Sequence, residues 1–213
     1  MREKDAKRQI IEICESCQLD VDKIVGALEK YEQELIRWQK IKNLVSRETL
    51  NEIWSRHFLD SVQLYTLFPQ DSQRLLDFGS GGGLPAVPLA IMGKSRGLSV
   101  TMVEANGRKC SFLRQLGRLL GLAIEVRGER AEALGRISGV DLFTARGFAS
   151  LDVTFGFLEP HFSENSSAFL QKGRGYKEEL KAAAENWRYD YQTIESLVAP
   201  ESVILDIRGL KRR

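Results

Sequence analysis

The sequence predicts an α/β protein, a mostly parallel, doubly wound sheet preceded by a helical extension. Three observations lead to this fold. Residues before 70 show helical patterns and no strand-like run. From residue 74 onward, short apolar runs alternate with helical patterns, which is typical of a parallel sheet with helices on both faces. A glycine-rich turn, 77–83, joins the first strand to the first helix of that alternation. We therefore expect a helical lobe over 1–70 and a sheet domain over 71–213.

The sequence of the extension predicts three helices. The first covers 3–17 and the second covers 21–42, with Asn43 as its stop. The apolar stripe of the second helix, at helical spacing, consists of Ile24, Leu28, Tyr31, Leu35 and Trp38. Thr49-Leu50-Asn51-Glu52 fits a capping box that opens a third helix, and Pro69 ends it.

Strands and helices alternate after residue 74. The expected strands are 74–78, 99–104, 122–127, 140–145 and 167–171. The expected helices are 84–92, 107–120, 131–136, 150–158 and 177–188. Two last β segments, 191–197 and 203–208, leave little room for a helix between them, so we expect an antiparallel hairpin at one edge of the sheet.

The glycine turn is the most informative feature of the chain. Asp77 to Gly83 reads D-x-G-x-G-x-G. A dinucleotide fingerprint, counted from Gly79, fails because Leu84 stands at its third glycine position. A phosphate-binding P-loop fails because no Lys-Ser/Thr pair follows the glycines. A tight turn without a ligand remains an alternative.

An acidic residue follows the second strand. Glu104 stands 25 positions after Gly79, at the carboxyl end of that strand. A carboxylate there can accept both hydroxyls of a ribose, so the pair indicates a nucleoside ligand. The alternatives for Glu104 are a solvated loop acid or an N-cap for the helix that starts at Gly107.

Composition and charge are those of an ordinary soluble domain, with 43% hydrophobic residues, 28% charged residues and a net charge of +2. No stretch is long and apolar enough for a membrane span, and the N-terminus does not resemble a signal peptide, so we expect a cytoplasmic protein without a membrane partner. Residues 94–136 carry nine basic and four acidic side chains, and the tail adds Arg208, Lys211, Arg212 and Arg213. Clustered positive charge favours a phosphate backbone as partner, and a solvated helix face is the alternative.

The cysteines predict no metal site. Cys14 and Cys17 form a C-x-x-C within a helical pattern, and a zinc ion would need further ligands from Cys110, His57 and His161. We expect reduced thiols.

Several segments, in order along the chain, resemble one family. They are Trp38 with Asn43-Leu44-Val45-Ser46, then 56–61 (RHFLDS), 77–91 (DFGSGGGLPAVPLAI), 107–115 (GRKCSFLRQ) and 145–151 (ARGFASL). The glycine turn and Glu104 are similar to those of class I S-adenosylmethionine-dependent methyltransferases. Together the segments resemble the RsmG (GidB) family within that class. Small departures are Ala86 for a glycine, Gly147 for an alanine, and Val45 for a threonine.

The resemblance implies a fold, a cofactor and a substrate. The fold is a Rossmann-like sheet of seven strands with the last strand antiparallel. The family transfers a methyl group from S-adenosylmethionine to N7 of a guanine in 16S ribosomal RNA, at nucleotide 527 of the 530 loop. The cofactor contacts, to which we add Gly81 from the same turn, fall on Gly79, Leu84, Glu104, Ala131, Glu132 and Arg146.

The implied chemistry agrees with the residues that come after the fourth strand. Guanine N7 carries no proton, so it needs alignment with the methyl group and no general base. The chain has neither the Asn/Asp-Pro-Pro-Tyr of amino-group methylation nor a nucleophilic cysteine there, and Thr144-Ala145-Arg146-Gly147-Phe148 occupies the position. We expect Arg146 to orient the guanosine; a phosphate contact or an ion pair with Glu132 or Asp141 is the alternative. Phe148 is either a stacking platform or a core aromatic.

We expect RNA contacts at Arg56, His57, Arg108, Lys109, Lys172 and Arg174. For His57, a satisfied histidine between the lobe and the sheet is the alternative. The expected partner is 16S rRNA, within the small ribosomal subunit or an assembly intermediate, and the expected state is a monomer. The competing functions are a methyltransferase for a small molecule or protein, a nicotinamide-dependent oxidoreductase, and a nucleotide-binding module without catalysis.

Overall fold

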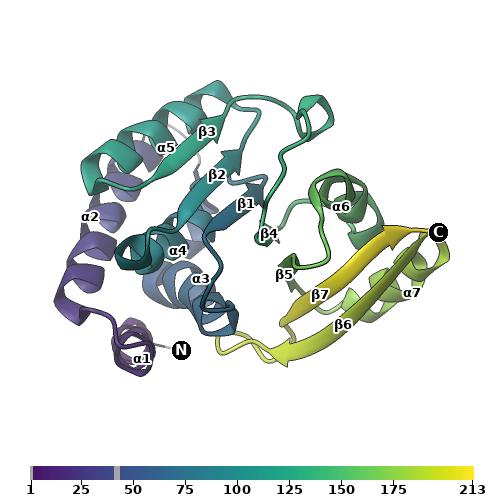
Figure 1. Ribbon diagram of the computed structural model, residues 1–213. Coiled ribbons are helices and arrows are strands. Elements are labelled where there is room, and N and C mark those ends of the chain that lie inside the picture. Colours follow the sequence, from purple (N-terminus) through teal and green to yellow (C-terminus); the bar gives the residue numbers. More distant parts are fainter. Residues whose placement is uncertain (1, 41–43) are drawn as a thin grey trace.

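A computed structural model describes residues 2–40 and 44–213 and shows a seven-stranded sheet (Figure 1). The strands are β1 (Arg74–Phe78), β2 (Ser99–Val103), β3 (Ile124–Arg127), β4 (Leu142–Arg146), β5 (Ser167–Lys172), β6 (Trp187–Glu195) and β7 (Val203–Arg212). Their order is β3-β2-β1-β4-β5-β7-β6, with β1 to β5 mutually parallel and β7 antiparallel to both of its neighbours. The predicted fold and its closing hairpin are confirmed.

Helices cover both faces of the sheet. On one face, α4 (Ala86–Gly93) and α5 (Gly107–Leu120) share a hydrophobic core with the extension. On the other, α6 (Leu151–Leu158) and α7 (Tyr176–Asn186) pack in a second core. Because successive strand side chains alternate in direction, Leu75 of β1 faces the first core and Leu76 and Phe78 face the second.

In the extension, drawn in purple in Figure 1, α2 (Val21–Gln39) packs on α4 and α5, and α1 (Glu3–Ser16) packs on α2 and on the third helix of the extension. Asp20 caps α2 by accepting a hydrogen bond from the backbone N–H of Lys23 at 3.1 Å. The apolar stripe predicted for α2 is buried except for Trp38, which packs partly buried with Phe112. The predicted helix end at 41–42 and its stop, Asn43, lie outside the described residues.

The third helix is irregular. It runs as a 3-10 segment (Arg47–Glu52), a π-helical turn (Trp54–Leu59), α3 (Asp60–Val62) and a second 3-10 segment (Gln63–Leu67). The predicted capping box is wrong, because the helical backbone already begins before Thr49. The Thr49 hydroxyl donates instead to the Ser46 carbonyl at 2.9 Å and lies 2.8 Å from His57 Nε2. Interruptions of this π-helical kind frequently mark functional sites.

Two other predictions need correction. The helix expected over 131–136 is only a 3-10 turn, Ala131–Ala133, because Leu134 turns to an extended backbone and packs against the second core. The helix expected to reach 188 ends at Asn186, and β6 begins at once. Trp187 fixes this change: it is buried, and its indole N–H donates to Asp152 Oδ1 at 2.8 Å. Among the described residues, no helix is long and apolar enough to cross a membrane.

Candidate cofactor and acceptor site

The glycine turn lies between β1 and α4 and requires its glycines. Gly79, Gly81 and Gly83 have φ angles of +69°, +56° and +94°, which side chains other than glycine rarely adopt. A Cβ atom on Gly79 would lie 2.5 Å from Phe148 Cδ2. The backbone N–H of Gly79 donates to the Val103 carbonyl at 3.0 Å, which ties the turn to the end of β2. The turn therefore exposes main chain where a side chain would otherwise stand.

Glu104 lies beside this turn, as the spacing predicts. Its Oε2 accepts from the Gly81 N–H at 2.9 Å, and its Oε1 accepts from the Asn106 N–H at 2.7 Å. The N-cap alternative for Glu104 is wrong, because Asn106 Oδ1 caps α5. Each carboxylate oxygen has a second lone pair, so the group retains acceptor capacity for two hydroxyls.

Asp77 supports the turn from below. It is fully buried and accepts hydrogen bonds from Ser80 Oγ at 2.5 Å and Thr144 Oγ1 at 2.6 Å. Burial raises the pKa of Asp77 to about 7, against the lowering effect of these two hydroxyls. The side chain joins β1 to β4 and has no surface left for a ligand.

Tyr31 is a contributor that the sequence did not indicate. Its hydroxyl donates to the Gly82 carbonyl at 2.5 Å, across 51 residues of chain, and the side chain is fully buried. On the sequence, Tyr31 is one apolar position of the α2 stripe. The extension therefore holds the glycine turn through a hydrogen bond as well as through packing.

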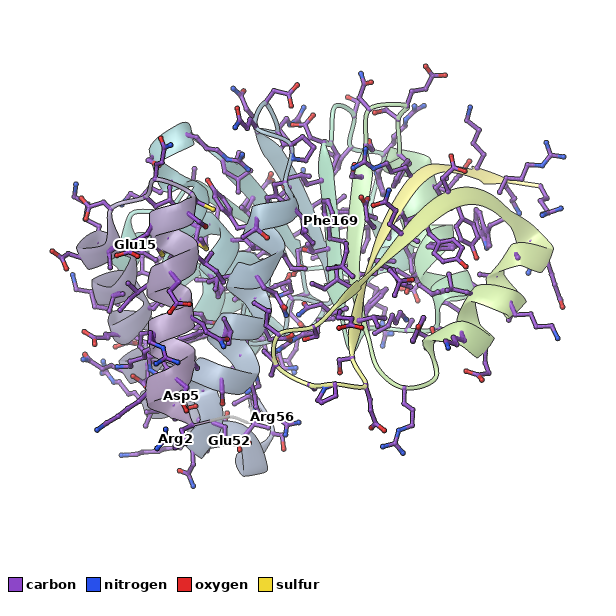
Figure 2. The ribbon with its side chains drawn as sticks, turned by 90° about the horizontal axis from the view of Figure 1, so that it is seen from below. Arg2, Asp5, Glu15, Glu52, Arg56 and Phe169 are labelled. Atoms are coloured by element: carbon purple, nitrogen blue, oxygen red, sulfur yellow. The ribbon has the colours of Figure 1, made fainter. Side chains whose placement is uncertain are left out.

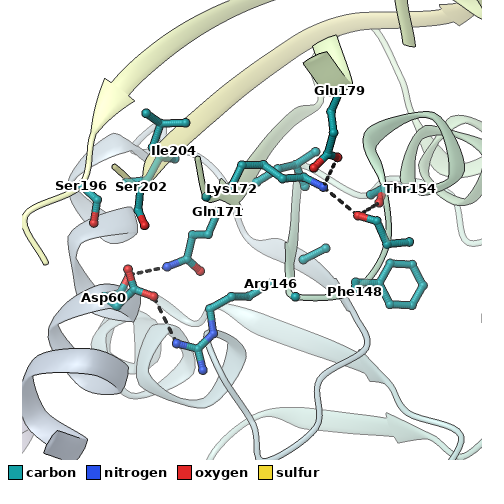
Figure 3. Close-up of a pocket in the computed structure, with 16 residues that line it drawn as sticks. Asp60, Arg146, Phe148, Thr154, Gln171, Lys172, Glu179, Ser196, Ser202 and Ile204 are labelled. Atoms are coloured by element: carbon teal, nitrogen blue, oxygen red, sulfur yellow. Dashed lines mark hydrogen bonds and ion pairs between the residues drawn. The ribbon is translucent and has the colours of Figure 1, made fainter. Parts of the chain in front are cut away.

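A cavity of about 360 Å³ opens at the carboxyl ends of β4 and β5 (Figure 3). Its walls combine the aromatic ring of Phe148 with charged and amide side chains. The charged residues that line it are Asp60, Arg146, Lys172 and Glu179. Ligands of parallel α/β sheets bind at this edge, so the cavity is the candidate acceptor site. It adjoins the glycine turn through Phe148, which packs on Gly79.

Arg146 reaches from β4 to the extension. Its Nη1 donates to Asp60 Oδ2 at 3.1 Å and to the Arg56 carbonyl at 3.2 Å. Its Nη2 lies 3.3 Å from His57 Nδ1. The predicted alternative partner Asp141 instead accepts from backbone N–H groups at the start of β1. The Nε–H of Arg146 has no hydrogen-bond partner among the described residues.

His57 is neutral and held from both sides. Burial, followed by the cations of Arg146 and Arg56, lowers the pKa of His57 to about 4. Because the Thr49 hydroxyl donates to a carbonyl, it accepts from His57 Nε2–H, and His57 Nδ1 then accepts from Arg146. The imidazole orients Arg146 and carries no charge for a phosphate.

The cations predicted to contact RNA occupy two places. Lys172 lines the cavity, with 11% of its side chain exposed, and its Nζ donates to Glu179 and to the Ala149 carbonyl. Arg174 is exposed and pairs with Glu201. Arg56 lies on the extension, and its Nη1 is 3.7 Å from Glu52 Oε2. Figure 2 labels both residues in a view from below. Arg108 and Lys109 begin α5, next to Glu104.

The remaining predicted residues lie near the same edge of the sheet. Leu84 is buried directly after the glycine turn. Ala131 and Glu132 lie in the 3-10 turn after β3, which pairs with β2. Cys14 is buried, which raises the pKa of its thiol to about 11. Within the described ranges, no group of three or more potential ligands could hold a metal ion.

Comparison with known proteins places these observations in a family. The family model described as rRNA small subunit methyltransferase G matches residues 24–204. A ribosomal RNA small subunit methyltransferase G from Ruegeria sp. (strain TM1040) is 37% identical, over 92% of this chain and 96% of the relative. The protein of the same name from Jannaschia sp. (strain CCS1) is 35% identical, over 98% and 97%.

Solved structures share the fold at low identity. A ribosomal protein L11 methylase from Lactobacillus delbrueckii subsp. bulgaricus has a TM-score of 0.59 and 17% identity, over 74% of this chain and 79% of that chain. A SAM-dependent methyltransferase from Aquifex aeolicus has a TM-score of 0.57 and 14% identity, over 80% and 96%. The fold is therefore the class I, Rossmann-like methyltransferase fold. With its glycine turn, its Glu104 and a family match over most of its length, the chain belongs to the rRNA small subunit methyltransferase G family.

Proposed function

We propose that this protein transfers a methyl group from S-adenosylmethionine to N7 of a guanine in 16S rRNA, the guanine at nucleotide 527 of the 530 loop. The family membership supports a methyltransferase of small-subunit rRNA. The observation that carries the proposal is the contact of Glu104 with Gly81, which sets a ribose acceptor beside the glycine turn. Phe148 links this turn to the cavity of about 360 Å³, because it packs on Gly79 and lines the cavity.

The residues present fit S-adenosylmethionine. Glu104 would accept the ribose hydroxyls, while the main chain of Gly79 and Gly81, whose positive φ angles favour glycine, would lie against the rest of the ligand. Leu84, Ala131, Glu132 and Arg146 complete the proposed contacts. When bound, the cofactor supplies an electrophilic methyl group on a sulfonium ion.

The cavity suits an acceptor that needs no general base. Its candidate proton acceptors are already bonded: Asp60 to Arg146 at 3.1 Å, and Glu179 to Lys172 at 2.8 Å. N7 of guanine has a free lone pair and no proton, so what remains for the protein is orientation and exclusion of water. Arg146 would provide orientation, because the edge of its guanidinium that carries Nε–H is free to contact the nucleotide.

RNA would bind across the cavity mouth. We propose contacts from Arg56, Arg108, Lys109 and Arg174, with His57 and Lys172 nearer the base, and a monomer acting on the small subunit or an assembly intermediate in the cytoplasm. The contact at Arg174 can be tested, because an RNA phosphate would replace Glu201 as the partner of its guanidinium. Arg174→Ala should lower the slope of log K for RNA against log salt by about one. An unchanged slope would count against this contact.

Methyl transfer to 16S rRNA from cells that lack the modification tests the function. We expect one methyl group at N7 of the stated guanine; a product elsewhere would remove the specific proposal. Under conditions in which Arg146→Ala still binds the cofactor, the variant should lose turnover, and full turnover with intact cofactor binding would refute the orienting role. Equilibrium binding separates the alternatives: S-adenosylmethionine and S-adenosylhomocysteine should bind, whereas NAD, the ligand of an oxidoreductase, should not.

A further inference from the structure

We propose that Asp60 is the counter-charge of the acceptor cavity: it neutralises Arg146, so that the positive charge arriving on the guanine is not opposed by an unpaired cation. This inference rests on the proposed function. Asp60 has no role predicted from the sequence, although it lies in the motif 56–61.

The proposed reaction moves a positive charge into the cavity. The lone pair of guanine N7 forms the new N–CH₃ bond, and the pair of the broken S–CH₃ bond returns to sulfur. The sulfonium becomes a neutral thioether, the purine becomes a cation, and no proton moves. The protein therefore has to stabilise a charge that appears on the base in the transition state.

The cavity is polar and carries no net charge. Its two cations, Arg146 and Lys172, each have a carboxylate of their own, Asp60 at 3.1 Å and Glu179 at 2.8 Å. Figure 3 shows the two pairs on opposite sides of the cavity. Phosphate can displace the carboxylates of the exposed pairs at Arg56 and Arg174, whereas the two pairs of the cavity are more buried, so their pairing calls for another explanation. A base that becomes cationic provides it.

Asp60 is held where its charge acts on the cavity. Its Oδ1 accepts from Gln63 Nε2 at 2.9 Å, and its backbone carbonyl accepts from Gln171 Nε2 at 2.8 Å. It also lines a second cavity of about 300 Å³, so the Asp60–Arg146 pair lies in the wall between the two. The side chains are 17% and 23% exposed, and water screens the pair weakly.

The first test is Asp60→Asn, which removes the charge and keeps the size. The single-turnover rate of methyl transfer should fall by about 10- to 100-fold, if the unpaired charge of Arg146 acts on the base over an assumed separation of about 6 Å at an effective dielectric constant of about 20. The dissociation constant for RNA should stay unchanged or decrease, because Arg146 is then an unpaired cation. A merely structural role of Asp60 would weaken RNA binding together with the rate.

A double-mutant cycle isolates the coupling. In an Arg146→Gln background, Asp60→Asn should cost less than about threefold in rate, because no cation remains to be neutralised. An equal cost in both backgrounds would overturn the proposal. The matched control is Asp206→Asn, which removes a buried carboxylate that pairs with the exposed Arg208 at 3.0 Å, outside the cavity lining. It should leave the rate unchanged.

Glu179→Gln keeps the proposal testable if the Asp60 variant does not fold. It leaves Lys172 unpaired, so the rate should again fall while RNA binding is kept; an unchanged rate would contradict the role of a neutral cavity. Mapping the methylated atom in the wild-type product separates a failure of the proposed function from a failure of the inference about Asp60. If the methyl group is not on N7, the proposed function fails. If it is on N7 and neither variant slows transfer, only this inference fails.

Discussion

Tyr31→Phe tests whether the extension holds the cofactor turn. The change removes only the hydroxyl that donates to the Gly82 carbonyl at 2.5 Å, while the ring keeps its packing on Phe58 and Phe112. A buried acceptor left without its donor costs about 1–3 kcal/mol. For a chain of 213 residues this corresponds to a fall in Tm of about 2–12 °C.

The same hydrogen bond should appear in cofactor affinity. Gly82 lies within the glycine turn, so without this hydrogen bond the turn would be ordered in part only when the ligand binds. The Kd for S-adenosylhomocysteine should therefore rise, by about tenfold for each 1.4 kcal/mol of binding free energy that is spent on ordering the turn. Thermal unfolding by circular dichroism and isothermal titration calorimetry measure the two effects. Tyr65→Phe is the control, because the Tyr65 hydroxyl makes no hydrogen bond among the described residues. An unchanged Tm and an unchanged Kd for Tyr31→Phe would show that the extension does not hold the turn through this bond.

Three further predictions concern the turn and its surroundings. Gly79→Ala should abolish cofactor binding and destabilise the fold, because its Cβ would meet Phe148 at 2.5 Å; Gly97→Ala, at φ +77° with nothing within 4 Å, should suffer backbone strain alone. Glu104→Gln should raise the Kd for S-adenosylmethionine by about 10- to 100-fold in calorimetry, since it loses the charge that would accept both ribose hydroxyls; an unchanged Kd would remove Glu104 from the site. Burial lowers the pKa of His57 from 6.5 to about 4. Between pH 6.5 and pH 4, His57 therefore binds a proton in the unfolded chain and remains neutral in the folded chain. Acidification from pH 7.5 to pH 4.5 should therefore lower the free energy of unfolding of the wild-type protein by about 2.5 kcal/mol more than that of His57→Gln, measured by urea unfolding at the two pH values; equal losses would contradict the assignment.

The parts of the site that the sequence predicts are local. The glycines after β1 and Glu104 after β2 come together because neighbouring parallel strands end at one edge, a rule that spacing alone can use. The contact of Arg146 with Asp60 spans 86 residues and crosses from sheet to extension, so no local pattern contains it. The same holds for Tyr31, because its place in an apolar stripe predicts burial of the ring but not the hydrogen bond of its hydroxyl to Gly82.

The failures of secondary-structure prediction also have tertiary causes. Thr49 fits a cap by spacing, but its hydroxyl is engaged by His57 and the Ser46 carbonyl. Trp187 continues a helical pattern in the sequence, yet its hydrogen bond to Asp152 and its burial turn the chain into β6. In each case a contact from a distant or neighbouring element outweighs local preference.

In the proposed mechanism, the glycine turn and the neutral cavity beside it direct a methyl group to an atom that needs no general base. The decisive experiment incubates the protein with S-adenosylmethionine and unmodified 16S rRNA and maps the methylated atom by mass spectrometry and strand cleavage at 7-methylguanosine. We expect a single product, at N7 of guanine 527. Methylation of an exocyclic amino group, of a ring carbon, or of a different nucleotide would contradict the mechanism.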